Sequence, residues 1–445
     1  MLKMPDAPTK PATHISDAAK GTSGDGRNGF QAVVLAVQPV TDSTVCGLSL
    51  AERGRRMAGK RGAARVTVID SAAAAAKLPE LASADLELLV IRVRDQVVHF
   101  PLIDAVRPGE PHRDESAKDE KRDVAVAIDP SSSDYAGAMW IPAARSAEAL
   151  DALSVDPLEG DRALAEAWLA KGIASSHPHG DIARHPAATR ADRRGATKML
   201  FRLVHKEQDS LLSTYVNRRV SYPFTRLFLP TPITPNMLSI MVFIIGVTGC
   251  WFMAQGSYSG AVIATLMVLF AGYLDGCDGE IARLRHEGSK FGAWLDTIVD
   301  ELTTMLFFIA AGLHYYTHNP TQWVATSIVV GAVAAAISVY IIYYYLIVVA
   351  HSGNSQDYPT SSGGWLDYLR LIIKRDFINL GSVFLAIAGL TNIIFFGIFL
   401  GAVGTALVLI PQHIALRWSR RSQADDVQDA EPELAASSSG TFTKL

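Results

Sequence analysis

The hydrophobic pattern divides the chain into two unlike parts. From about residue 237 to residue 413, apolar residues form runs close to the roughly 20 residues that a membrane-spanning helix needs. The six runs lie at 237–254, 259–283, 291–313, 322–349, 376–390 and 392–413. Residues from 1 to about 200 contain only short apolar runs. The pattern therefore predicts an α-helical integral membrane bundle of six transmembrane helices, which follows a soluble N-terminal part.

Short apolar runs in the N-terminal part have the length and composition of β-strands. Four of them lie at 32–36, 64–69, 86–91 and 124–128. Segments of helical character, 48–59 and 71–81, lie between several of these runs. Strands that alternate with helices are typical of a parallel sheet covered by helices. We therefore expect an α/β domain here.

The segments around these two parts complete the predicted organisation. Residues from about 198 to 229 mix apolar and basic side chains at helical spacing, which is typical of an amphipathic helix in the membrane interface. The C-terminal tail is rich in Ala, Ser and Glu, a composition that favours disorder. The expected division is 1–27 disordered N-terminus, 28–195 α/β domain, 196–232 interfacial amphipathic helix, 233–418 six-helix domain and 419–445 disordered tail.

Charge in the connections between the apolar runs predicts the orientation in the membrane. The connections 254–260, 314–322 and 389–392 contain no Lys or Arg. The other connections carry the basic residues Arg218, Arg219, Arg226, Arg283, Arg285, Lys290, Arg370, Lys374, Arg375, Arg417, Arg420 and Arg421. The positive-inside rule places this basic side, with both termini, in the cytoplasm. We expect the inner or plasma membrane of a bacterium or archaeon.

Two further features of the sequence concern the location of the soluble part and its partners. The first 30 residues lack the apolar core of a signal peptide, so the soluble part is expected to stay in the cytoplasm. The formal net charge of the chain is −3, which indicates no nucleic-acid partner.

Four aspartates lie in or beside the second and third apolar runs. Charged side chains at membrane depth are costly, so they usually face a cavity and mark function. Asp275 and Asp278 are at positions i and i+3, and Asp296 and Asp300 are at i and i+4, so each pair shares one face of a helix. The link 284–291 is short, which predicts antiparallel neighbouring helices. The four carboxylates are then expected to converge at the cytoplasmic side.

Carboxylates that converge in this way predict a metal site. Their mutual repulsion would keep some of them protonated unless one or two divalent cations were bound. Oxygen ligands favour Mg²⁺, Mn²⁺ or Ca²⁺ over zinc. Gly279 and Ala282 form a small-residue edge that lets a flat ligand approach, and Arg283 suits a phosphate. Carboxylates and a metal beside an arginine are typical of phosphoryl transfer.

The spacing of these residues resembles the signature of a known family. The pattern Asp275-x2-Asp278-Gly279-x2-Ala282-Arg283-x8-Gly292-x3-Asp296-x3-Asp300 is similar to that of the CDP-alcohol phosphotransferases and is complete at every defining position. The resemblance covers about residues 200 to 415. It implies six transmembrane helices, a homodimer and a site that faces the cytoplasm. It also implies transfer of a substituted phosphate from a CDP-linked donor to an alcohol or phospho-alcohol acceptor, with release of CMP.

The resemblance also implies roles for individual residues. Asp275, Asp278 and Asp296 would be metal ligands for Mg²⁺ or Mn²⁺, with Ca²⁺ as an ion that can also bind. Asp300 would be the general base and a ligand of a second metal ion. The residues implied to bind CDP are Asp275, Asp278, Gly279, Ala282, Arg283 and Gly292.

Two candidates match the family more loosely. Thr234-Pro235-Asn236 resembles the family's Pro-Asn entry to the first span, which makes Asn236 a further CDP-binding candidate. The alternative is a helix start with no ligand role, since proline there favours a turn. The candidates for holding an acceptor phosphate are Lys374, Arg375 and Arg285. For Lys374 and Arg375, at the start of the fifth span, the alternative role is to anchor the helix to anionic membrane lipid.

The N-terminal part resembles a nucleotidyltransferase fold. Fusion of such a domain to this membrane family resembles the bifunctional enzymes that make di-myo-inositol phosphate phosphate. The chain departs from an active nucleotidyltransferase, because residues 37–44 after the first strand contain no glycine and no basic residue to hold a triphosphate. Arg92 and Arg94 would repel a metal ion at Asp95. We therefore expect a degenerate and inactive domain.

The substrates and one other class of function stay open. The fused architecture suggests a soluble inositol phosphate joined to a CDP-inositol donor. The alternative within the family is phospholipid synthesis from CDP-diacylglycerol. The alternative from another class is a non-catalytic membrane scaffold or an ion-binding protein.

Overall fold

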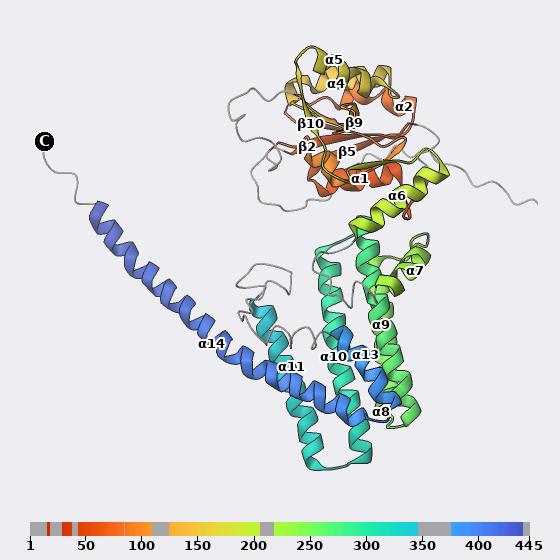
Figure 1. Cartoon of the computed structure of the whole chain (residues 1–445). Coiled ribbons are helices and arrows are strands. Elements are labelled where there is room, and N and C mark those ends of the chain that lie inside the picture. Colours follow the sequence, from red (N-terminus) through yellow and green to blue (C-terminus); the bar gives the residue numbers. More distant parts are fainter. Residues whose placement is uncertain are drawn as a thin grey trace, which may run out of the picture. The chain divides into compact units, whose positions relative to one another are not determined.

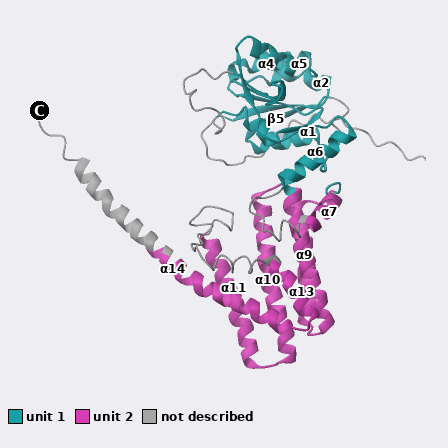
Figure 2. Cartoon of the chain, in the orientation of Figure 1, with its two compact units in different colours: residues 1–207, 229–231, 282–287 teal, residues 208–228, 232–281, 288–445 magenta. Residues whose placement is uncertain are grey.

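In a computed structural model, the chain forms two compact units. The structure describes residues 16–17, 29–37, 43–83, 85–108, 124–204, 218–345 and 375–438. Unit 1 comprises residues 1–207 with the two short segments 229–231 and 282–287, and unit 2 comprises 208–228, 232–281 and 288–445 (Figure 2). Two residues of the sequence motif, Ala282 and Arg283, therefore belong to unit 1, and its aspartates belong to unit 2. The predicted disordered N-terminus, 1–27, lies outside the described residues except for 16–17.

Unit 1 is built on a seven-stranded sheet with the order β1-β5-β2-β6-β9-β8-β10 (Figure 1). The strands are β1 (Ser16–Asp17), β2 (Phe30–Leu35), β5 (Ala63–Ile69), β6 (Leu88–Arg92), β8 (Val124–Ile128), β9 (Tyr135–Ile141) and β10 (Ala174–Pro178). Strand β2 pairs in parallel with β5 and β6, whereas β9 is antiparallel to both of its neighbours. The four strands predicted from apolar runs correspond to β2, β5, β6 and β8. The α/β prediction is thus confirmed.

Seven helical segments accompany the sheet in the described part of unit 1. They are α1 (Leu50–Lys60), α2 (Ala72–Ala75), the 3-10 helix η1 (Leu78–Leu81), α3 (Phe100–Asp104), α4 (Ala143–Val155), α5 (Gly160–Ala170) and α6 (Arg190–Leu203). Four shorter strands form two small sheets, β3 (Thr44–Val45) with β4 (Leu48–Ser49) and β7 (Gln96–Val98) with β11 (Arg184–Pro186). The core joins Val33 and Val90 of the sheet to Leu150 of α4 and Trp168 of α5. Burial of these side chains supplies the main driving force for folding of this unit.

Unit 2 is helical. Its helices are α7 (Arg218–Phe228), α8 (Pro235–Ala254), α9 (Tyr258–Leu284, of which the last three residues belong to unit 1), α10 (Lys290–His318), α11 (Gln322–Tyr344), α13 (Arg375–Ile387) and α14 (Thr391–Ser438). Among the described residues, α8, α9, α10, α11 and residues 391–415 of α14 are long and apolar enough to cross a membrane. The apolar part of α13, Phe377–Ile387, is shorter. The structure therefore has five candidate spans where the sequence predicted six.

Small residues let the helices of unit 2 approach closely. A Cβ atom at Gly246 of α8 would lie 2.7 Å from the side chain of Thr303 on α10, and one at Gly249 would lie 3.1 Å from the carbonyl oxygen of Ala264 on α9. A core that includes Met253, Phe308 and Phe395 joins these helices to α13 and α14. Close helix packing through small residues is the usual arrangement in membrane bundles.

Two segments differ from the expected organisation. The region 196–232, predicted as one interfacial helix, contains the end of α6 in unit 1 and the separate helix α7 in unit 2, with residues 205–217 outside the described part. Helix α6 joins unit 1 because it buries Met199, Leu200 and Phe201. Helix α14 continues to Ser438, where the sequence predicted a disordered tail from residue 419, because Ala, Glu and Gln in this segment favour a helix.

Candidate active site

Local sequence signals start the helices that carry the candidate site. Thr234 caps α8 by accepting a hydrogen bond from the amide of Met237 at 3.3 Å, and Pro235 occupies the first turn. Ser289 caps α10 in the same way and accepts a hydrogen bond from the amide of Gly292 at 2.9 Å. These caps set where α8 and α10 begin, and so which faces Asn236 and Asp296 occupy.

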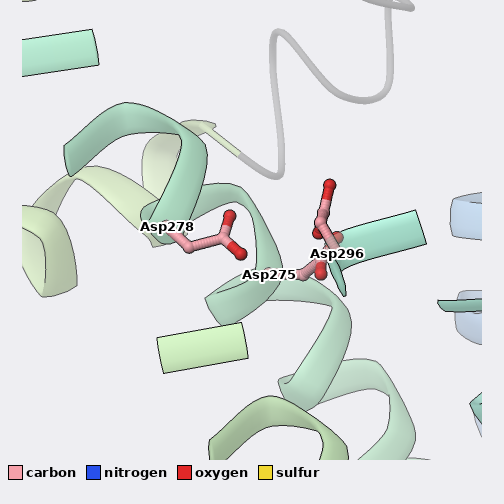
Figure 3. Close-up of side chains that lie close together, drawn as sticks. All are labelled: Asp275, Asp278 and Asp296. Carbon is pink, nitrogen blue, oxygen red and sulfur yellow. The ribbon is translucent and has the colours of Figure 1, made fainter. Parts of the chain in front are cut away.

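Three aspartates converge from two helices. Asp275 and Asp278 of α9 and Asp296 of α10 each offer a carboxylate oxygen, and these oxygens lie within 4.8 Å of one another (Figure 3). Asp278 is buried, with 6% of its surface exposed, and the other two are half-buried. The three side chains labelled in Figure 3 point toward one another. The sequence predicted that four carboxylates converge, and three of them form this cluster.

The cluster fits a divalent cation by its geometry and by its donor atoms. Ligand oxygens about 2.1 Å from Mg²⁺ in an octahedron lie about 3 to 4 Å from one another, so a group within 4.8 Å needs only a small adjustment to share one ion. All three donors are carboxylates, the ligand type that suits Mg²⁺, Mn²⁺ and Ca²⁺. Three like charges in a mostly buried site also need a positive charge nearby.

Ser239 of α8 orients Asp278, and no pattern in the sequence indicated this contact. The buried Ser239 hydroxyl donates a hydrogen bond of 2.5 Å to one carboxylate oxygen of Asp278, and the amide of Gly279 donates one of 2.5 Å to the other. These bonds leave lone pairs on both oxygens and fix the direction of the carboxylate. Partners that orient a ligand in this way usually matter for metal affinity.

The predicted nucleotide-binding residues occupy two regions of the structure. Asn236 lies directly against Gly292, because a Cβ atom at Gly292 would be 2.8 Å from the Asn236 side-chain oxygen. A larger residue at 292 would displace Asn236. Gly279 follows Asp278 on α9, and Ala282 and Arg283 lie in the last turn of that helix, where both are half-buried.

Asp300 lies one helical turn beyond Asp296 on α10 and is half-buried. It is not one of the three residues whose oxygens form the close cluster. Asp300 is thus a separate carboxylate on the helix that carries Asp296.

Glu280 holds α7 against α9 and was not identified from the sequence. It is fully buried, and its two carboxylate oxygens accept hydrogen bonds from Ser221 at 2.8 Å and from Thr225 at 2.5 Å. Two residues along a helix correspond to a rotation of about 200°, so Glu280 points away from the side of α9 that carries Asp278. The spacing of Ser221 and Thr225, one helical turn apart, was the only available signal for this contact.

Of the three candidates for an acceptor phosphate, only Arg285 has a side chain that the structure describes. The buried Arg285 donates hydrogen bonds to the carbonyl oxygens of Leu229 and Thr231 at 2.6 and 2.5 Å, so its guanidinium is engaged with the main chain rather than open to a phosphate. Lys374 lies outside the described residues. Arg375 begins α13, where only its backbone is described.

Comparisons with known proteins agree with the motif. The family model for CDP-alcohol phosphatidyltransferase matches residues 232–411. A relative from Aquifex aeolicus named "Bifunctional IPC transferase and DIPP synthase" is 34% identical over 108 residues, which are 24% of this chain and 24% of the relative. A protein of the same name from Archaeoglobus fulgidus is 32% identical over 28% of this chain and 25% of its own length.

A third relative has a different name. Archaetidylinositol phosphate synthase from Pyrococcus horikoshii is 36% identical over 18% of this chain and 42% of its own length. Each of these three matches therefore spans less than half of the relative. The family match covers the helices that bring Asp275, Asp278 and Asp296 together, and two of the relatives are named as bifunctional enzymes. Residues 232–411 form a domain of the CDP-alcohol phosphatidyltransferase family.

Proposed function

We propose that this chain is a divalent-cation-dependent CDP-alcohol phosphotransferase. The observation that carries the proposal is the convergence of Asp275, Asp278 and Asp296 within a domain of that family. These three residues would hold Mg²⁺ or Mn²⁺, with Asp300 contributing to a second ion. The bound metal would neutralise charge on the phosphate oxygens of the donor.

The remaining chemistry falls to side chains of the site. Asp300 accepts the proton of the acceptor hydroxyl as that oxygen attacks the phosphorus that bears the donor alcohol. A new bond forms between this phosphorus and the acceptor oxygen, and the bond to the CMP oxygen breaks. Arg283 binds a phosphate of the cytidine diphosphate group. Asn236, Gly279, Ala282 and Gly292 shape the space for the nucleotide.

The arrangement in the membrane is part of the same proposal. We infer six spans, with α13 as the shortest, and a cytoplasmic position for both termini and the aspartates. Basic residues in alternate connections support this orientation. The apolar and basic faces of α7 suit a position in the membrane interface. A homodimer is proposed from the family resemblance alone.

The preferred substrates are a CDP-inositol donor and an inositol phosphate acceptor. Their support is the name of two relatives, "Bifunctional IPC transferase and DIPP synthase", and the presence of an α/β unit before the membrane-type domain. A CDP-diacylglycerol donor is the second candidate, favoured by the similarity to archaetidylinositol phosphate synthase, whose name indicates a lipid product.

For unit 1 we propose an inactive relative of the nucleotidyltransferases. Arg92 and Arg94 at the carboxyl end of β6 are engaged by Glu159, and Arg92 also lies 3.2 Å from Asp161. Acidic partners for both arginines support a structural role for them, rather than binding of a triphosphate. Release of pyrophosphate from CTP by the full chain would contradict this interpretation.

The assay for the proposed function is CMP release by the purified full-length protein in lipid nanodiscs. CDP-inositol with inositol phosphate is expected to give CMP with Mg²⁺ or Mn²⁺ and none with EDTA. Product label in the organic phase, obtained with CDP-diacylglycerol only, would identify the lipid alternative. A scaffold or ion-binding protein would bind the metal but show no rise in melting temperature with CDP.

Replacement of Ser239 by Ala is expected to weaken the metal site without removing a ligand. Loss of the hydrogen bond to Asp278 should raise the Mg²⁺ concentration for half-maximal CMP release by about 10- to 100-fold, the usual effect of removing a partner that orients a ligand. A suitable control is Ser327→Ala, because Ser327 is also buried but donates to Trp323 within its own helix. An unchanged metal requirement in Ser239→Ala would exclude the orienting role.

A further inference from the structure

A buried arginine of unit 1 holds the end of α9 and the loop that follows it. Arg53 of α1 has only 1% of its surface exposed. Its guanidinium donates hydrogen bonds of 2.9 Å to the carbonyl oxygens of Leu284 and Val45, and it lies 3.2 Å from Nε2 of His286. Leu284 and His286 belong to the segment 282–287, which is part of unit 1 (Figure 2).

The contact with Leu284 acts as a cap of α9. Leu284 is the last residue of this helix, and the last four carbonyl groups of a helix have no partner within it. A cation at this end also meets the negative pole of the helix dipole. Burial lowers the pKa of Arg53 to about 10, which leaves the guanidinium charged at neutral pH.

His286 gives the loop an uncommon shape that its neighbours maintain. Its φ of 55° lies in the left-handed region, which residues other than glycine seldom adopt. The ring of Phe100 lies 5.2 Å from the His286 ring, and that of His99 lies 6.4 Å away. Burial, followed by the charge of Arg53, lowers the pKa of His286 to about 3. A neutral imidazole at this position can accept a hydrogen bond from Arg53.

Further contacts join residues 45–56 to the segments 229–231 and 282–287. Arg56 donates hydrogen bonds of 2.8 Å to the carbonyl oxygen of Arg285 and to the carboxylate of Glu287. Gly47 has a φ of 75°, and a Cβ atom there would lie 2.2 Å from the carbonyl oxygen of Leu229, so this approach requires glycine. The structure thus keeps residues 45–56, 229–231 and 282–287 in one packed group.

We propose that Arg53 is a positioning residue for binding of the cytidine diphosphate group, which it serves by capping α9 and fixing the helical turn that carries Ala282 and Arg283. This inference rests on the proposed function, because it assigns the nucleotide to Arg283. Arg283 is the residue immediately before Leu284, so a loose cap would let its side chain sample several directions. Binding of a diphosphate would then require this turn to become ordered.

The test compares Arg53→Met with Arg55→Met in the full-length protein. Arg55 lies on the same helix, and its hydrogen bonds go to Glu52. In Arg53→Met we expect faster hydrogen–deuterium exchange in residues 282–290. We also expect CDP to bind about tenfold more weakly with Mn²⁺ present, the order of effect of losing a hydrogen bond from a charged group. KM for the donor should rise by a similar factor with a smaller change in kcat, and Arg55→Met should match the wild type.

The outcomes separate this inference from the proposed function. If wild type and Arg55→Met release no CMP, the proposed function fails, whereas exchange and CDP affinity still report on the cap. A folded Arg53→Met with wild-type exchange in 282–290 and wild-type CDP affinity would overturn the inference. If Arg53→Met does not fold, the variant Arg53→Gln tests whether Arg53 caps α9. This variant removes the charge but keeps a donor, so intermediate exchange supports the cap and unchanged exchange rejects it.

Discussion

Replacement of Asp278 by Asn is expected to abolish the response of the protein to Mg²⁺ and Mn²⁺. Asp278 is the most buried of the three clustered carboxylates, and Ser239 and the amide of Gly279 hold it in place. Asn has nearly the same shape and can still accept the hydrogen bond from Ser239. Loss of a residue that orients a ligand costs about 10- to 100-fold in metal affinity, so loss of a ligand itself should cost more than about 100-fold.

The same substitution should affect stability in opposite ways with and without metal. Without metal, removal of one of three repelling charges is expected to leave the melting temperature unchanged or higher. In the wild type, metal at 100 times its Kd should add about 2.7 kcal/mol to the free energy of unfolding, and in Asp278→Asn it should add almost none. A thermal melt of both proteins with EDTA and with Mn²⁺ measures this difference.

A structural role for the aspartates makes a different prediction. If Asp278 served in an ion pair between helices, Asp278→Asn would lower the melting temperature even with EDTA. Glu301→Gln, the same chemical change on an exposed residue of α10, is the matched control and should keep the full response to Mn²⁺. A wild-type response in Asp278→Asn would exclude this residue as a ligand.

The sequence predicted features that depend on neighbours along the chain. The bounds of α8, α9 and α10 lie within a few residues of the expected spans, except that α10 extends to His318, because long apolar runs and capping residues define such helices locally. The aspartates could be placed for the same reason, since Asp275 and Asp278 share a face through helical periodicity alone. Strand β9 was not predicted, because Gly137 and the alanines beside it weaken the signal for a strand.

Contacts between distant residues had no comparable signal. Ser239 and Asp278 are 39 residues apart, and Arg53 and Leu284 are 231 residues apart. The periodicity of one helix contains no information on its partner in another element. A fully buried charge such as Glu280 or Arg53 shows that partners exist, since an isolated charge is costly to bury, but only the fold identifies them.

The two buried charges also show how the candidate site is supported. Glu280 ties α9 to α7 from the side opposite Asp278, which Ser239 orients. Arg53 caps α9 at Leu284, six residues after Asp278. Within unit 2, α9 is thus held both at its acidic face and at the opposite face. Rigid support of this kind is what a site needs to keep ligands in a productive geometry.

Replacement of Asp300 by Asn is expected to reduce CMP release by about 100- to 10,000-fold, the usual contribution of a general base. Asn cannot accept the proton of the acceptor hydroxyl. Asp300 lies outside the group of three clustered oxygens, so the first metal ion should still bind. The variant should therefore keep the rise in melting temperature with Mn²⁺ and with CDP, which separates it from Asp278→Asn.

The pH dependence of kcat distinguishes the base from a second metal ligand. With Asp300 as base, kcat of the wild type should fall as the pH decreases through the pKa of this carboxylate in the complex, and the residual activity of Asp300→Asn should lack that limb. With Asp300 acting only as a ligand, high Mn²⁺ should restore much of the lost activity. Glu301→Gln, a neighbouring acid of α10, should retain wild-type kcat and pH dependence. Full turnover by Asp300→Asn would rule out the general-base role and leave Asp275, Asp278 and Asp296 as the acidic machinery of the site.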